Sequence, residues 1–174
     1  RVAAKPMKMG ESSEVKVKDR VLAINHAGNE GMRPAVVVSR REFAGYWEYM
    51  LPSAIFTAPP IMDWGGAALV APDGRLVGIG SLIVNDPLET GSASIGPGNM
   101  FIPIDDLKPV MADLMTQGRP STTPRPYLGL NSEEVRGRIF ITRVSPDTPA
   151  AKAGLKQGDL ILGVGGKPVT SLAE

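Results

Sequence analysis

Short apolar runs separated by glycine and proline constrain the fold of this chain most strongly. Its 174 residues include 20 glycines and 16 prolines. Residues 21–24 and 35–38 are brief apolar runs, and residues 15–18 alternate between valine and lysine, as a strand with one buried face does. Many short strands with frequent Gly and Pro between them predict an all-β barrel or sandwich.

A hairpin is predicted where Pro72-Asp73-Gly74-Arg75 separates the apolar residues 69–70 from 76–79. Asp-Gly tolerates the positive φ angles of a tight turn, so the two flanking segments are expected to pair as antiparallel strands.

One helix is predicted after the β-rich part. Its apolar positions share one face at helical spacing, and Gly118 stands where a left-handed C-cap is expected. Asp105 or Asp106 is a candidate N-cap, and Pro109 then falls in the first turn, where a missing N–H costs least. The apolar positions are Leu107, Val110, Met111, Leu114 and Met115.

A proline-rich stretch, residues 119–126, reads as a linker because three prolines stiffen it and no apolar side chain anchors it. After this linker, strands are predicted at 139–141 and 159–162, and a short alanine-rich helix is predicted at 148–155.

Composition excludes several kinds of function. The 19 basic and 18 acidic side chains nearly cancel, which argues against a nucleic-acid or anionic-membrane binder. Cysteine is absent, so disulfides and thiolate chemistry are excluded, and the single histidine, His26, leaves no histidine cluster for zinc. No apolar run is long enough to span a bilayer. We expect neither a metal site nor a cofactor.

Two segments resemble parts of the HtrA group of trypsin-like serine proteases. Asp63-Trp64-Gly65-Gly66-Ala67-Ala68-Leu69-Val70 is similar, without a gap, to the nucleophile turn Gly-Asn-Ser-Gly-Gly-Pro-Leu-Val. Residues 73–79 resemble the hairpin that follows it. Residues 19–26 and 101–104 resemble the entry into this barrel and the exit from it.

The second resemblance is to an HtrA-type PDZ domain. It is carried by Tyr127-Leu128-Gly129-Leu130, by residues 144–155 and by residues 158–162, in the family's order. The two resemblances imply an all-β chain: a trypsin-like C-terminal barrel with a terminal helix at 1–118, a linker at 119–126, and the first part of a truncated PDZ domain at 127–174.

The resemblance implies a nucleophile turn without its nucleophile. Gly65 occupies the position of the catalytic serine, and Asp63, Trp64 and Gly65 form the turn that would offer oxyanion-hole donors. Asp63 replaces a glycine and places a carboxylate where an oxyanion would develop. The catalytic histidine and aspartate come from the family's first barrel, which this chain is expected to lack. His26 is interpreted as an exposed loop residue, so no catalytic residue is present.

Peptides are the partners that the resemblance implies. Ser81, Leu82 and Ile83 either offer a strand edge to an extended peptide or are an ordinary barrel strand. Tyr127, Leu128, Gly129 and Leu130 match the loop whose backbone N–H groups hold a peptide's C-terminal carboxylate. A helix that walls this groove is expected beyond Glu174. Unfolded protein segments are further candidate partners, homo-oligomerisation is possible, and a periplasmic or envelope location rests on the resemblance alone.

Three functions stay open at this point. The chain is a fragment of an HtrA-like endopeptidase, inactive as written because its nucleophile has been replaced, or a natural pseudoprotease that holds peptides, or a β-domain without peptide binding. The codon at position 65, and an upstream histidine and aspartate at triad positions, separate the first two hypotheses.

Overall fold

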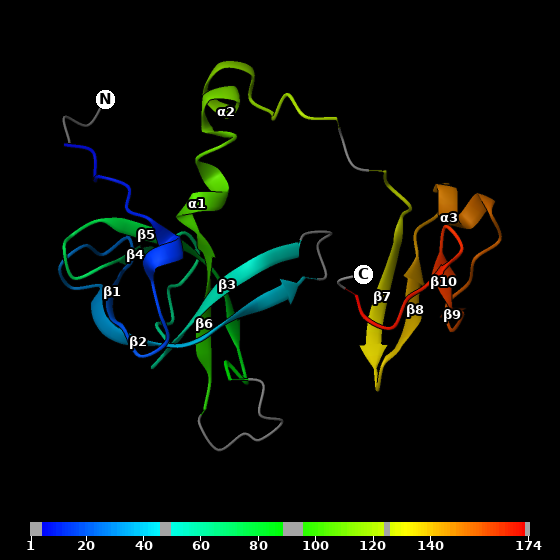
Figure 1. Cartoon of the computed structure of the whole chain (residues 1–174), viewed down its shortest axis with the longest axis horizontal. Helices are drawn as coiled ribbons and strands as arrows, with labels where there is room; N and C mark the ends of the chain where they lie inside the picture. Colours follow the sequence, from blue (N-terminus) through cyan, green and yellow to red (C-terminus); the bar gives the residue numbers. More distant parts are fainter. Residues whose placement is uncertain (1–4, 46–49, 89–95, 124–125, 173–174) are drawn as a thin grey trace. The chain divides into compact units, whose positions relative to one another are not determined.

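The computed structural model describes residues 5–45, 50–88, 96–123 and 126–172 (Figure 1). The chain divides into two compact units, one made of residues 1–42 and 51–121 and the other of 43–50 and 122–174. No helix in the described part of the chain is long and apolar enough to cross a membrane.

Six strands of the first unit close into a barrel in the order β1-β2-β3-β6-β5-β4. They are β1 (Arg20–Ile24), β2 (Met32–Ala44), β3 (Met50–Ala58), β4 (Ala68–Val70), β5 (Leu76–Val84) and β6 (Gly98–Pro103). β1 runs antiparallel to both β2 and β4, and β5 runs antiparallel to β4 and β6. The predicted β-barrel and the predicted hairpin between β4 and β5 are confirmed, with Gly74 at φ 82° in the turn.

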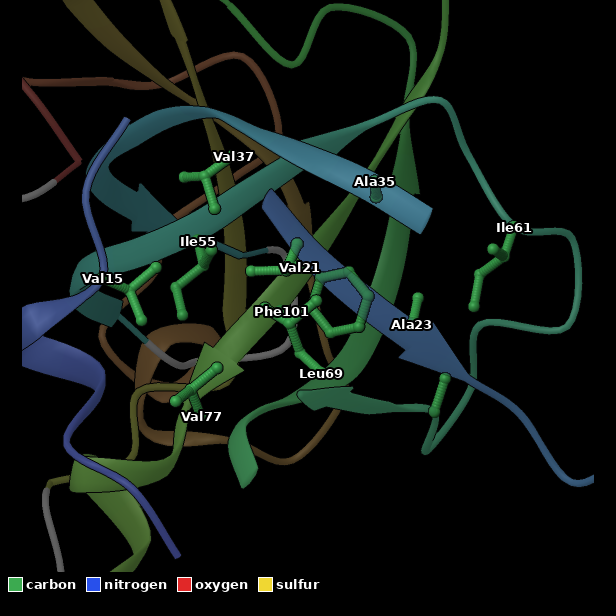
Figure 2. Close-up of a cluster of buried hydrophobic side chains, with 11 residues drawn as sticks. Val15, Val21, Ala23, Ala35, Val37, Ile55, Ile61, Leu69, Val77 and Phe101 are labelled. Carbon is green, nitrogen blue, oxygen red and sulfur yellow. The ribbon is translucent and has the colours of Figure 1, made fainter. Parts of the chain in front are cut away.

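The barrel core is built from side chains that alternate along the strands, as the two-residue period of a strand requires. Val21 and Ala23 of β1 point inward, as do Ala35 and Val37 of β2 (Figure 2). Phe101 of β6 lies among them and is fully buried. The apolar runs at 21–24 and 35–38 therefore supply side chains to the barrel core, as a barrel strand is expected to do.

Residues 15–18 do not form the strand that their alternation predicts. Ser12–Glu14 is a 3₁₀ turn, η1, and Lys18 has φ 79°. Asp19 accepts a hydrogen bond from the Lys16 N–H at 2.8 Å, and the Lys18 N–H donates to Val37 O at 2.7 Å. These bonds to neighbouring groups bend the segment, and the alternation leaves Val15 buried and Val17 exposed without a strand partner.

Arg40 of β2 joins residues 12–18, which precede β1 and are called the incoming segment below, to the barrel. Its Nη1 donates to Ser12 O and Val15 O, both at 2.7 Å. Its Nη2 donates to Ser53 of β3, to the carbonyl oxygen at 3.1 Å and to the hydroxyl at 2.9 Å. One half-buried guanidinium therefore joins η1, β2 and β3, which an exposed arginine could not do.

The predicted helix is divided in two. α1 spans Ile104–Leu107 and α2 spans Met111–Gln117, because Pro109 has no N–H with which to continue the ladder. Pro103 precedes α1 without a side-chain cap, so the N-cap prediction for Asp105 or Asp106 is wrong. Gly118 ends α2 at φ 70°, as predicted.

Asp105 instead binds the incoming segment. Its carboxylate accepts from the Ser13 N–H at 2.9 Å and pairs with Lys108 Nζ at 2.7 Å, and its own N–H donates to the buried Ser12 hydroxyl. Burial acts to raise the pKa of Asp105, but the bonds from Lys108, Ser13 and Ser12 together hold it far below its ordinary value. The Asp105 carboxylate is therefore ionised in the folded barrel at neutral pH.

The second unit contains a three-stranded antiparallel sheet in the order β7-β8-β9. Its strands are β7 (Leu130–Val135), β8 (Arg138–Val144) and β9 (Leu160–Ile161), and a short pair, β10 (Gly163–Val164) and β11 (Lys167–Pro168), follows. The predicted helix at 148–155 is shorter than expected: α3 spans Pro149–Lys152, and the chain turns at Gly154 with φ 81°. The strands predicted at 139–141 and 159–162 are present as β8 and β9.

Candidate functional site

The turn that precedes β4 is closed by three backbone hydrogen bonds. The Ala67 N–H donates to Trp64 O at 3.0 Å, which makes residues 64–67 a β-turn. The Gly66 N–H donates to Gly80 O at 2.9 Å, and the Gly80 N–H donates to Ala67 O at 2.7 Å. Gly66 has φ 75°, a conformation that favours glycine. The turn is thus hydrogen-bonded to Gly80, in the middle of β5.

Gly65 stands exposed at the tip of this turn. A Cβ built on it would meet no atom within 4 Å, so the space for a side chain is open and empty of protein. Asp63 is also exposed, whereas Trp64 is partly buried and packs against the barrel core. The turn therefore presents backbone and a carboxylate to solvent, and no hydroxyl.

Gly80 is a site residue that the sequence analysis missed. A Cβ at this position would lie 2.0 Å from Trp64 O, so the carbonyl of the turn occupies the space of any side chain. The available signal was a glycine inside the apolar strand 76–84, because a strand glycine often marks a close backbone approach.

Beyond Gly80, β5 pairs with β6 alone among the described strands. β4 pairs with β5 along 76–79, and Ser81 is the residue at which the β5–β6 register shifts. Leu82, Ile83 and Val84 pair with β6 on one side, while β4 has already ended on the other. Ser81, Leu82 and Ile83 thus directly follow the residue that fastens the turn, and Ile83 is 37% exposed.

His26 lies in the turn that follows β1. Ile24 pairs with Ala68, so this turn leaves the barrel at the end where the 63–67 turn lies. His26 is exposed and makes no hydrogen bond or ion pair with any described residue. The described ranges also contain no group of three or more His, Cys, Asp or Glu side chains placed to hold a metal ion.

The loop before β7 holds the other predicted binding residues. Tyr127 and Leu128 are more than half exposed, and Gly129 has φ 76°. The Leu128 carbonyl accepts from the Ala150 N–H at 2.9 Å, and the Gly129 carbonyl accepts from the Ser145 N–H at 2.8 Å. The N–H groups of Leu128 and Gly129 have no acceptor in the described part of the chain. β7, which starts at Leu130, is an edge strand of its sheet.

The closed six-stranded barrel and the small three-stranded sheet match the trypsin-like barrel and the PDZ-like region that the sequence resemblance implies. The sequence profile of the PDZ domain matches residues 140–174. The chain is 30% identical over 125 residues to the serine protease Do-like HtrB of Bacillus subtilis (strain 168), covering 63% of this chain and 26% of that protein.

Two further similarities agree with this. The serine endoprotease DegS of Haemophilus influenzae (strain ATCC 51907 / DSM 11121 / KW20 / Rd) is 38% identical over 100 residues, covering 56% of this chain and 28% of that protein. The solved structure titled HtrA-type protease AlgW with decapeptide matches with a TM-score of 0.57 at 23% identity, covering 95% of this chain and 53% of that one. The chain thus spans about a quarter of the length of these curated relatives. It is an HtrA-like, serine protease-related chain that carries PDZ sequence.

Proposed function

We propose that this chain is the peptide-binding, non-hydrolytic part of an HtrA-like protein. The observation that carries the proposal is that residue 65 is a glycine, without a side chain, at the tip of a turn that is hydrogen-bonded to β5. Acyl transfer by this group of enzymes needs a hydroxyl there. The turn is hydrogen-bonded to β5 and carries no hydroxyl that could attack a carbonyl carbon.

Binding is supported by two open strand edges. Past Gly80, β5 pairs only with β6 among the described strands, and β7 is the outer strand of its sheet. An extended peptide can add to either edge through main-chain hydrogen bonds, which need no particular peptide side chain. Residues 81–83 and residues 127–130 are therefore the proposed binding residues, the latter for a C-terminal carboxylate.

The domain assignment is part of this proposal. Residues 1–118 would form the trypsin-like barrel with its terminal helix, residues 119–126 the linker, and residues 127–174 a portion of the PDZ domain. The PDZ profile match begins at residue 140, so assigning 127–139 to the same domain rests on the pairing of β7 with β8.

An endopeptidase with a replaced nucleophile is the rival function. Asp63 and Trp64 depart from the family pattern beside Gly65, which favours a natural pseudoprotease over a single replacement. A serine codon at position 65 of the gene, together with an upstream histidine and aspartate at triad positions, would establish the rival.

Peptide binding by strand addition is tested on the full-length protein. We expect saturable binding of a fluorescein-labelled ten-residue peptide rich in β-branched residues and ending in a valine carboxylate, and mass spectrometry should recover the peptide uncut. The matched control carries N-methyl groups on alternate residues, which remove main-chain donors from one edge. Its affinity should fall at least about tenfold, equivalent to ~1.4 kcal/mol. Equal affinity of the two peptides would exclude strand addition.

A further inference from the structure

The side chain that holds the proposed carboxylate-binding loop in shape is Thr148. We infer that Thr148 is a positioning residue for the N–H donors of Gly129 and Leu130, acting through the carbonyls behind them. This inference rests on the proposed function, because it concerns the same loop. It follows from the bonds that hold the two loop carbonyls, from the hydrogen bonds of the Thr148 hydroxyl, and from the packing of the Thr148 side chain against Gly129.

The bonds to the two loop carbonyls fix the direction of the loop's donors. A peptide unit is planar and trans, so its C=O and the following N–H point in opposite directions. The Leu128 carbonyl is held by the Ala150 N–H at 2.9 Å, which turns the Gly129 N–H away from α3. The Gly129 carbonyl is held by the Ser145 N–H at 2.8 Å, which turns the Leu130 N–H away from β8.

The register of β7 and β8 agrees with this orientation. Leu130 pairs with Val144, and the bond from the Ser145 N–H to Gly129 O makes that pair a non-hydrogen-bonded one. In such a pair the N–H of each residue faces away from the partner strand, so the Leu130 N–H faces the open edge of β7. Two successive donors, Gly129 and Leu130, thus have their directions set by carbonyl contacts behind the loop.

Thr148 joins the two carbonyl contacts. It is the N-cap of α3, and its hydroxyl accepts from the Ala151 N–H at 3.4 Å, beside the Ala150 N–H that holds Leu128. The same hydroxyl donates to Ser145 O at 2.7 Å and lies 3.4 Å from Gly129 O. It therefore contacts Ser145, whose N–H holds the Gly129 carbonyl, and Ala151, the residue after the Ala150 whose N–H holds the Leu128 carbonyl.

Packing adds a steric contact to the hydrogen bonds. Thr148 is only 8% exposed, and a Cβ built on Gly129 would lie 2.3 Å from both its Cβ and its Cγ2. The Thr148 side chain thus presses against the back of Gly129, on the side opposite the proposed ligand. Removing its hydroxyl while keeping its shape separates the positioning role from the packing role.

The test uses full-length protein with Thr148→Val, which keeps the shape, and Thr148→Ser, which keeps the hydroxyl. Two probes are titrated: the fluorescein-labelled peptide with a free carboxylate and the same peptide with a C-terminal amide. For Thr148→Val we expect affinity for the carboxylate peptide to fall about tenfold and affinity for the amide to change less than about twofold, because only the donors aimed at the carboxylate are disturbed. Thr148→Ser should keep the native preference.

The outcomes separate this inference from the proposed function. If the native protein binds carboxylate and amide equally, the loop is not a carboxylate site, so the carboxylate role of residues 127–130 and the positioning role of Thr148 both fail, while peptide binding by strand addition stands. If the native protein prefers the carboxylate and Thr148→Val keeps that preference, the positioning role alone is overturned. An equal loss of affinity for both peptides in Thr148→Val also overturns it, because that pattern reports a general structural defect.

Discussion

Replacing Arg40 with methionine is expected to lower the free energy of unfolding of the barrel by about 2 kcal/mol, within the range for breaking a partly buried hydrogen-bond network. The guanidinium is the donor for Ser12 O, Val15 O and both oxygens of Ser53. Methionine fills part of the space but donates no hydrogen bond, so these oxygens lose the bonds that Arg40 gives them, and Ser12 O keeps the longer one from the Val15 N–H at 3.3 Å. Asp105 and Asp106 also lose the cation that faces them.

Urea unfolding followed by tryptophan fluorescence measures this effect, since Trp64 packs against the core. Arg33→Met is the matched control on the same strand. Arg33 is exposed and, within the described part of the chain, donates to the nearby carbonyls of Glu30 and Met32 alone, so its replacement should change the unfolding free energy by less than about 0.5 kcal/mol. Equal stability of the two variants would show that Arg40 does not join the incoming segment to the barrel.

Gly80→Ala is expected to destabilise the barrel by about 3 kcal/mol, at the upper end of overpacking effects. The added methyl would lie 2.0 Å from Trp64 O and 3.2 Å from Ala67 N. Both contacts are with backbone atoms, which cannot rotate away as a side chain does. The turn must therefore move off β5, and the hydrogen bonds that join Gly66, Ala67 and Gly80 must stretch.

Gly65→Ala adds the same methyl at the tip of the turn that lies against Gly80, and it is the control. It meets nothing within 4 Å, so we expect a change in unfolding free energy within about 0.5 kcal/mol. Urea unfolding reports the stability, and the tryptophan emission maximum, to which Trp64 contributes, reports the position of the turn. A Gly80→Ala protein as stable as Gly65→Ala would mean that the turn is not seated against β5.

Local signals in the sequence predicted much of the fold. The apolar runs at 21–24 and 35–38 became β1 and β2 because alternate side chains enter one core. Asp73-Gly74 predicted its hairpin because the preference for positive φ is a property of the residue itself. Gly118 predicted the end of α2 for the same reason.

Contacts between residues far apart in the sequence determine the features of the fold that local sequence patterns predicted wrongly. Residues 15–18 have the pattern of a strand, yet Arg40 and Asp105 hold the neighbouring residues in a 3₁₀ turn. The Ser13–Asp105 bond joins residues 92 positions apart, so no local window contains both. Asp105 was expected to cap its own helix and instead binds the incoming segment.

The candidate site divides in the same way. Gly65 could be located from the spacing of the motif around it, and Tyr127-Leu128-Gly129-Leu130 from the order of the segments that follow. Gly80 and Thr148 could not be located, because their importance depends on which atoms lie behind them. A Cβ at Gly80 meets Trp64 O, and the Thr148 side chain meets Gly129, and both encounters exist only in the folded chain.

The most direct test of the central claim treats the full-length protein with a biotinylated fluorophosphonate, which labels activated serines, and with fluorescent casein, using trypsin as the positive control. We predict no covalent label on any serine within residues 1–174 and no release of casein fluorescence. A labelled serine in this range together with casein hydrolysis would contradict the claim that this turn binds without cutting.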